Sequence, residues 1–319
     1  MLRNVKPHLP ALLVLFVALT LLAGCGGGGE VPADGARRAG DGPLRLVATT
    51  GIVGDVAREV GGEHAEVESL MGPGVDPHLY KASESDVRRL AEADLILYNG
   101  LHLEGKMGDI LVKMARQRPV IAVTEQAPPE RLREPPEFLG QYDPHLWFDV
   151  GLWASSAEVV AEELAGLDPE HAADYRANAA RYRAELEELD RWVAEQIASI
   201  PAERRVLVTA HDAFGYFGQR YGIEVVGLQG ISTLAEAGLQ DVERVVDLVV
   251  ERGVPAIFVE SSVPRRSIEA VQAAVRARGR EVAIGGQLYS DALGAAGTPA
   301  GSYVGMVREN VETIVGALR

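Results

Sequence analysis

The sequence predicts an α/β protein of two βα lobes, each with a mainly parallel sheet, joined by one long rigid helix that leaves a cleft between the lobes. Two blocks of the chain alternate short β-rich runs with helical segments, which is the rhythm of βα units. Residues 170–200, between the blocks, contain no Gly or Pro. The length of 319 residues also suits two lobes.

The first lobe is predicted over residues 44–168. Its strand-like runs lie at 44–50, 65–70, 95–99 and 119–123, and its helical segments at 51–62, 83–91, 107–116 and 151–165. This alternation is the rhythm of βα units around a mainly parallel sheet.

A linking helix is predicted over 169–200. About 30 residues at 1.5 Å each give a rod of about 45 Å. Coiled-coil dimerisation is the alternative, but Ala and Tyr at the inward positions favour a packed spacer within a monomer.

The second lobe is predicted over residues 201–319. Its strands are expected at 204–211, 223–229, 255–261 and 281–289, and its helices at 212–222, 236–252, 267–278 and 302–318. The carboxyl ends of the strands and the loops after them should face the cleft between the lobes.

The N-terminus has the features of an export signal, predicted over residues 1–24. Arg3 and Lys6 precede an apolar stretch that ends in small residues. Cys25, the only cysteine, follows Leu-Ala-Gly and resembles the lipobox of bacterial lipoproteins; the alternative is a spacer residue near an ordinary cleavage site. Residues 25–43 are Gly-rich and predict a flexible tether. The expected location is therefore outside the cytoplasm, anchored to a bacterial membrane by a lipidated Cys25.

The formal net charge of -15 argues against nucleic acid as a partner. An acidic surface is compatible with attracting cations.

Four polar residues lie at ends of predicted elements, two in each lobe. His78 and His145 follow Asp-Pro in the repeated motif DPHL, His211 closes a strand, and Asp291 follows the last strand. Each could singly be a surface or capping residue. Together, three imidazoles and one carboxylate suit tetrahedral Zn(II) or, with a bidentate carboxylate, five-coordinate Mn(II).

Three acidic residues are candidates for supporting roles. Pro fixes the backbone after Asp76 and Asp143, and either carboxylate could accept a hydrogen bond from an imidazole or from local backbone. Glu260, at a strand end, is a possible outer partner, a replacement ligand, or the general base of a hydrolase. His64, His102 and His171 are expected to lie on the surface.

Several motifs in order resemble the solute-binding lipoproteins of bacterial ABC importers for zinc and manganese, the cluster A-I binding proteins. They are GVDPHLYKASESDVRRLAEADLILYNGLHLE, DPHLWFDV, VTAHDAFGYFGQRYGIEVVGLQGISTLAEAG, AIFVESSVPRRSIEAV and GGQLYSDALG. The resemblance covers residues 44–319. It implies His78, His145, His211 and Asp291 as metal ligands, a cognate permease with its ATPase as partner, and only small lobe movements.

Two departures bear on the metal. Many zinc-specific members carry a His-rich loop before the second ligand, and residues 105–143 contain no His. Manganese-specific members often have Glu at the position of His211. The nitrogen-rich ligand set favours zinc on softness, so the expected metal is zinc or manganese, with zinc favoured. The alternative functions are a secreted zinc-dependent hydrolase using Glu260 as base, and a surface adhesin.

Overall fold

The computed structural model describes residues 42–138 and 140–319. The export signal, Cys25 and all of the tether but residues 42 and 43 lie outside these ranges, and their assignment stays a prediction. No helix in the described ranges is both long enough and apolar enough to cross a membrane.

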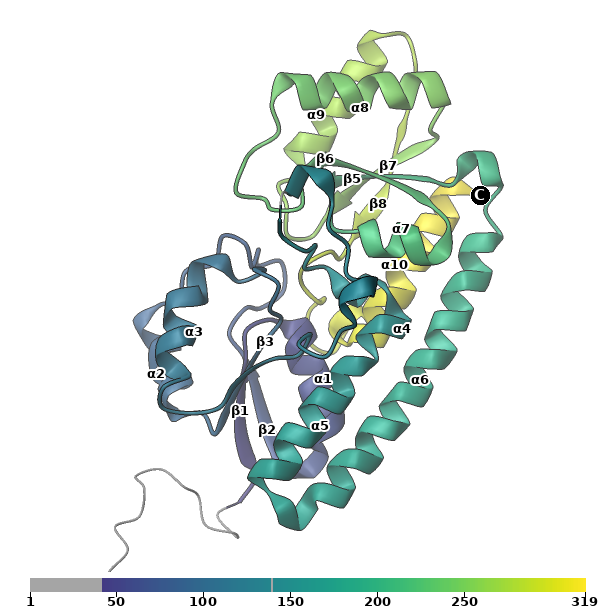
Figure 1. The fold of residues 1–319 in the computed structure, drawn as a ribbon. Coiled ribbons are helices and arrows are strands. Elements are labelled where there is room, and N and C mark those ends of the chain that lie inside the picture. Colours follow the sequence, from purple (N-terminus) through teal and green to yellow (C-terminus); the bar gives the residue numbers. More distant parts are fainter. Residues whose placement is uncertain (1–41, 139) are drawn as a thin grey trace, which may run out of the picture. The chain divides into compact units, whose positions relative to one another are not determined.

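The first lobe is built on a four-stranded parallel sheet with strand order β2-β1-β3-β4 (Figure 1). Its strands are β1 (Leu44–Ala48), β2 (Ala65–Ser69), β3 (Leu95–Tyr98) and β4 (Val120–Ala122). In the register, Leu46 lies opposite Val67 on one side and Leu95 on the other. The helices that follow are α1 (Gly51–Gly61), α2 (Glu84–Glu92) and α3 (Gly108–Met114).

Side-chain caps fix where these helices begin. The Thr50 hydroxyl accepts a hydrogen bond from the Val53 N–H at the start of α1, which turns the chain directly after β1. Ser83 and Asp86 form a reciprocal capping box at the start of α2, and this fixes the end of the loop that carries His78.

The predicted helix over 151–165 is two helices, α4 (Val150–Trp153) and α5 (Ser155–Leu167). The Ser155 hydroxyl donates to the Leu152 carbonyl and the Ser156 hydroxyl to the Trp153 carbonyl. Such side-chain bonds use carbonyls that accept backbone N–H groups in a continuous helix and favour a bend there. Ala154, between the two helices, keeps helical backbone angles, so the interruption is a local one.

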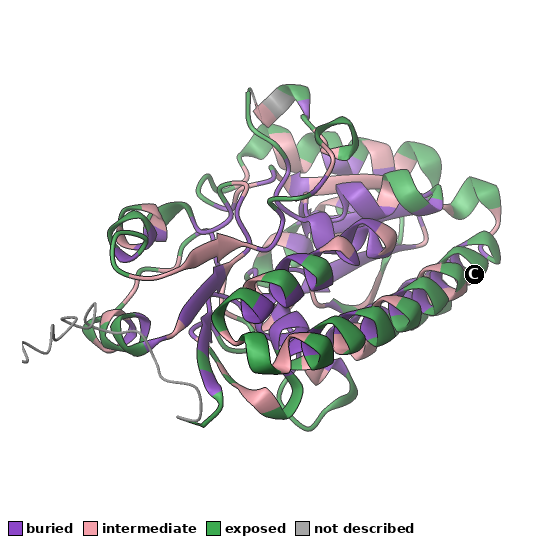
Figure 2. Ribbon diagram, turned by 60° about the horizontal axis from the view of Figure 1, so that its bottom comes forward, coloured by how far each residue is buried: buried purple, intermediate pink, exposed green. Residues whose placement is uncertain are grey.

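The long helix α6 (Ala172–Ala198) has 27 residues and lies within the predicted range. Its buried side chains recur every three or four positions: Tyr175, Ala179, Tyr182, Leu186, Leu189, Val193 and Ile197. It contacts α1 and α5 of the first lobe and also α10 (Tyr303–Leu318) and α7 (Gly215–Tyr221) of the second. In Figure 2 one side of this helix is exposed and the other is buried. It is a packed spacer that supports both lobes.

The second lobe contains two parallel strand pairs, β5 with β6 and β7 with β8. The strands are β5 (Val206–His211), β6 (Glu224–Gln229), β7 (Ala256–Glu260) and β8 (Ala283–Leu288), and the other helices are α8 (Leu239–Arg252) and α9 (Arg266–Ala277). β5 and β7 contact each other between the pairs. The two-lobe α/β class with parallel sheets and one long helix is confirmed.

One hydrophobic core extends across both lobes. Phe148 stacks on Phe214 with ring centroids 4.2 Å apart, and the same core cluster contains Leu46 from β1 and Ile314 from α10. Shared packing of this kind holds the lobes in a defined relation and opposes wide opening.

We expect Leu189→Ala to lower the free energy of unfolding by about 2–5 kcal/mol, because Leu189 is fully buried in this shared core. Glu188→Ala, at an exposed position one residue away, should change it by less than about 0.5 kcal/mol. Urea unfolding followed by circular dichroism measures both. Equal effects of the two substitutions would show that α6 is not anchored by its buried face.

Candidate metal centre

Four side chains from the two lobes converge on one buried point. Each of His78, His145, His211 and Asp291 offers a ligating atom, and these atoms lie within 4.8 Å of one another. The Nε2 atoms of His78 and His145 are 3.3 Å apart. The Asp291 carboxylate lies 3.4 Å from His145 Nε2 through Oδ1 and 3.3 Å from His211 Nε2 through Oδ2. These are the four residues that the sequence predicts as metal ligands.

The sheet architecture explains the convergence. His211 is the last residue of β5 and Glu260 the last of β7, and these two strands contact each other. The bond between Glu260 and His211 shows that the carboxyl ends of the two strands lie together. Asp291 follows β8 closely. His78 and His145 come from loops of the first lobe.

Two ligating atoms in the centre have no hydrogen-bond partner within the described ranges. They are His211 Nε2 and Asp291 Oδ1, and both are buried. Leaving a buried polar atom unsatisfied costs about 1–3 kcal/mol, so native structures seldom keep two in one place. A divalent cation among the four side chains would satisfy both atoms, and the donor set fits zinc or manganese.

His145 is held by Asp143, two residues before it. Asp143 Oδ1 lies 2.8 Å from His145 Nδ1 and accepts the His145 N–H at 3.0 Å. In a neutral imidazole this bond places the proton on Nδ1 and leaves the lone pair of Nε2 directed at the centre. Arg133 pairs with the other Asp143 oxygen, and the Tyr216 hydroxyl donates to the Asp143 carbonyl.

His211 is held by Glu260 in the same way. Glu260 Oε2 lies 2.5 Å from His211 Nδ1, and Oε1 accepts the His211 N–H at 2.8 Å. Both oxygens of Glu260 are thus engaged on the Nδ1 side of the ring, away from the converging Nε2 atoms. This geometry fits an outer partner of His211, and the convergence of ligating atoms does not include Glu260, whose oxygens lie against the Nδ1 atom and the backbone N–H of His211.

His78 is held through its backbone. Asp76 Oδ1 accepts the His78 N–H at 2.8 Å, and Asp76 Oδ2 accepts the Thr233 hydroxyl at 2.6 Å. No side chain in the described ranges forms a hydrogen bond with His78 Nδ1. Asp76 therefore binds local backbone and a hydroxyl of the second lobe, whereas Asp143 binds the imidazole of its histidine directly.

The surrounding carboxylates set the pKa values of two histidines. Burial alone would lower the pKa of His145, but Asp143 and Asp291 outweigh burial and raise it to about 9. Burial is outweighed at His211 as well, where Glu260 and Asp291 raise the pKa well above its usual value. Protons therefore compete with any cation for these two rings.

Asp291 and His78 shift in the opposite direction. Burial opposes ionisation of Asp291, yet His211 and His145 hold the pKa of that carboxyl well below its usual range. Burial lowers the pKa of His78 to about 3. One anionic oxygen donor and one neutral imidazole are therefore ready at neutral pH.

The other described histidines lie outside the centre. His64 and His171 stack on each other with ring centroids 3.8 Å apart, and each pairs with a carboxylate, Asp174 and Asp168 respectively. Their side chains are 21% and 36% exposed. His102 is exposed and has a left-handed backbone conformation with φ of 65°.

Sequence reasoning did not identify Arg133, Tyr216, Thr233 or Ser262 as contributors. The Ser262 hydroxyl donates to Asp291 Oδ2 at 3.1 Å. Ser262 lies two residues after Glu260, so its place next to a strand end was a usable signal. Tyr216 and Thr233 contact residues far away in the sequence, and no local pattern marks them.

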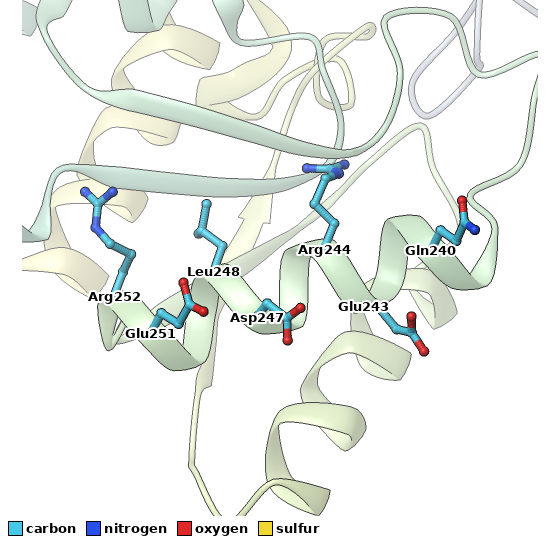
Figure 3. Close-up of a pocket in the computed structure, with 7 residues that line it drawn as sticks. All are labelled: Gln240, Glu243, Arg244, Asp247, Leu248, Glu251 and Arg252. Carbon is cyan, nitrogen blue, oxygen red and sulfur yellow. The ribbon is translucent and has the colours of Figure 1, made fainter.

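A shallow hollow on α8 is no rival site. In Figure 3, Arg244 and Arg252 point towards the neighbouring strand, and Glu243 and Asp247 point away from it. Arg244 donates to the Gly227 carbonyl at 3.0 Å, and Arg252 pairs with Glu224 at 3.1 Å. These cations are used within the lobe, so the hollow is a solvated helix face.

Two α/β lobes with a buried His₃Asp cluster between them define a binding protein with a site that could hold a divalent transition metal. The chain belongs to the family of the periplasmic zinc-uptake complex component A, whose model matches residues 46–317.

Relatives of this chain are named for binding zinc or manganese. The manganese-binding lipoprotein MntA of Bacillus subtilis is 48% identical over 307 residues, covering 96% of this chain and 97% of that protein. The zinc-binding protein TroA of Treponema pallidum is 49% identical over 280 residues, covering 88% and 90%. The solved structure of periplasmic zinc-binding TroA from Treponema pallidum superposes with a TM-score of 0.85 and covers 87% of this chain and 99% of that chain at 48% identity.

Replacing Glu260 by Gln should lower the pKa of His211 in protein treated with chelator, because the negative charge that favours the protonated ring is removed. Titration of the histidine signals by NMR measures this shift. Glu269→Gln, which removes an exposed carboxylate on α9, is the control and should leave His211 unchanged. An unaltered pKa of His211 in the Glu260 variant would contradict the assigned contact.

Proposed function

We propose that this protein is an extracytoplasmic solute-binding protein that captures zinc or manganese and delivers the ion to an ABC permease. The observation that carries the proposal is the buried cluster of three imidazoles and a carboxylate, with two of its atoms unsatisfied within the described ranges. The metal is cargo, so the site has to bind it and later release it.

The proposed ligands are His78, His145, His211 and Asp291. The proposed supporting residues are Asp143 and Glu260, which fix the Nδ1 atoms of two ligands, and Asp76, which fixes the backbone of the third. The proposed lobe boundaries are 44–168 and 201–319, with the linking helix within 169–200.

Zinc is the favoured metal on ligand chemistry. Three imidazole nitrogens suit zinc, and a bidentate Asp291 would complete a five-coordinate manganese site. The two relatives described above are named for different metals, so their names support zinc or manganese without choosing between them.

The partner and location follow from the same proposal. Lipidation of Cys25 would tether the monomeric protein outside the cytoplasmic membrane through residues 25–43, within reach of a permease and its ATPase. Several relatives are described as lipoproteins, which supports this arrangement.

A hydrolase is the weaker candidate, and we propose that the protein is not an enzyme. Catalytic zinc sites usually keep one position open for water, and here four protein groups surround the centre. Glu260, the candidate base predicted from the sequence, has both oxygens hydrogen-bonded to His211. Within residues 42–138 and 140–319, no specific contact or surface favours an adhesin.

We expect the soluble domain to bind Zn(II) or Mn(II) with one ion per chain, and Asp291→Ala to weaken binding by more than the roughly 10- to 100-fold typical of losing an outer-shell partner. His102→Asn is the control: His102 is exposed and has a left-handed φ, which Asn tolerates, so this variant should bind metal like the unaltered protein. Isothermal titration calorimetry measures both. Wild-type binding no tighter than micromolar, or full binding by the Asp291 variant, would refute the proposal.

Metal affinity should fall as the pH is lowered from about 9, well before the usual histidine pKa is reached. The pKa of His145 is about 9 and that of His211 is raised, so the metal must displace protons at neutral pH. Lowering the pH favours the protonated rings, and each displaced proton weakens affinity about tenfold per pH unit. Titrations at about pH 6 and about pH 8, in buffers of different ionisation enthalpy, count the protons released. Affinity that is constant over this interval would contradict the competition.

A further inference from the structure

The four converging side chains are not supported alike. His145 Nδ1 faces Asp143, His211 Nδ1 faces Glu260, and Asp291 Oδ2 accepts the Ser262 hydroxyl. Each of these supports comes from the lobe that carries the supported residue. His78 Nδ1 has no such partner in the described part of the chain, and His78 is the most exposed of the four at 4%.

The position of His78 instead depends on a carboxylate shared between the lobes. Asp76 Oδ1 accepts the His78 N–H, and Asp76 Oδ2 accepts the hydroxyl of Thr233, a buried residue in the second-lobe loop between β6 and α8. One carboxylate therefore joins the backbone of a first-lobe residue to a hydroxyl of the second lobe, 157 residues from Asp76 in the sequence.

A second close approach lies in the same loop of the first lobe. Gly74 has φ of +73°, and a Cβ built there would come within 3.3 Å of the Ser261 carbonyl oxygen. Thr233 and Ser261 thus bring two segments of the second lobe against residues 74–76. Both contacts require the lobes to be together, so they would be lost when the lobes part.

We propose that Thr233 is a positioning residue that couples closure of the lobes to the placement of His78 by way of Asp76. This inference rests on the proposed function in metal binding. It states that the contact between Thr233 and Asp76 helps to retain the bound ion. When the lobes are together, Thr233 orients Asp76 and Asp76 orients the His78 backbone. When they part, Asp76 loses its only side-chain partner among the described residues and His78 loses its fixed position.

The energetic consequence follows from linkage. A metal ion that binds only when His78 is in position stabilises every contact that positions His78, including the contact of Thr233 with Asp76. Removing the hydroxyl should therefore act on the lifetime of the closed, metal-bound state more than on the encounter with metal. Changes within one binding site usually appear in the dissociation rate.

The test compares Thr233→Val, which keeps the shape and removes the hydroxyl, with Thr233→Ser, which keeps the hydroxyl. Zinc dissociation is followed by stopped flow with an excess of a chromophoric chelator, and association is measured separately. We expect Val to speed dissociation about tenfold or more with little change in association, and Ser to restore slow dissociation. Ser232→Ala is the control, because it removes a neighbouring hydroxyl that accepts the Leu234 N–H within the same loop. Zinc should dissociate from this variant as slowly as from the unaltered protein.

A double-mutant cycle separates this role from a general effect on packing. If Thr233 acts through Asp76, then Thr233→Val should add little to the dissociation rate of Asp76→Ala. Additive effects, or an unchanged dissociation rate in Thr233→Val, would overturn the proposal. Failure of the unaltered protein to bind zinc in the same instrument would instead refute the proposed function.

Discussion

The constraint on which this structure depends is the burial of three imidazoles and one carboxylate around a common point. Burial without partners is costly, and His211 Nε2 and Asp291 Oδ1 have no hydrogen-bond partner within the described ranges. Outer contacts hold three of the four side chains in place: Asp143 contacts His145, Glu260 contacts His211, and Ser262 contacts Asp291. These contacts direct the ligating atoms of the three side chains toward the common point. The protein is therefore less stable locally than it would be with a cation bound there.

The fold supplies the framework that this arrangement needs. Parallel strands present their carboxyl ends at one edge, and the contact between β5 and β7 sets His211 beside Glu260. α6 contacts helices of both lobes, and the stack of Phe148 on Phe214 belongs to a core that both lobes share. The relation between the lobes is thus fixed by apolar packing, and the polar contacts at the centre adjust it on a finer scale.

Much of this could be predicted from the sequence. Hydrophobic periodicity indicated the strands and the long helix. The repeated DPHL motif, together with the other motifs that resemble the family, indicated the four converging residues. The outer contacts were harder. Asp143 and Glu260 were visible as candidates beside a ligand or at a strand end, but the role of Glu260 was open until its two oxygens were located. Thr233 could not be found, since its partner is 157 residues distant. The break at Ala154 was missed because no change of hydrophobic period marks it; two serine hydroxyls bond to backbone carbonyls there.

The four side chains come from both lobes, two from each, and this explains how a stiff molecule could release its metal ion. Bonds from zinc to nitrogen or oxygen are about 2.0–2.2 Å long and tolerate only about 0.2 Å of change. His78 and His145 lie on one lobe, and His211 and Asp291 on the other, so a relative shift of about 1 Å would break the set without disturbing either pair. Wide hinge motion is unnecessary. A shared core that permits only small shifts is therefore compatible with tight binding and with transfer. Apolar packing limits the range of lobe movement, and polar contacts across the lobes, such as that of Thr233 with Asp76, set the closed position within that range.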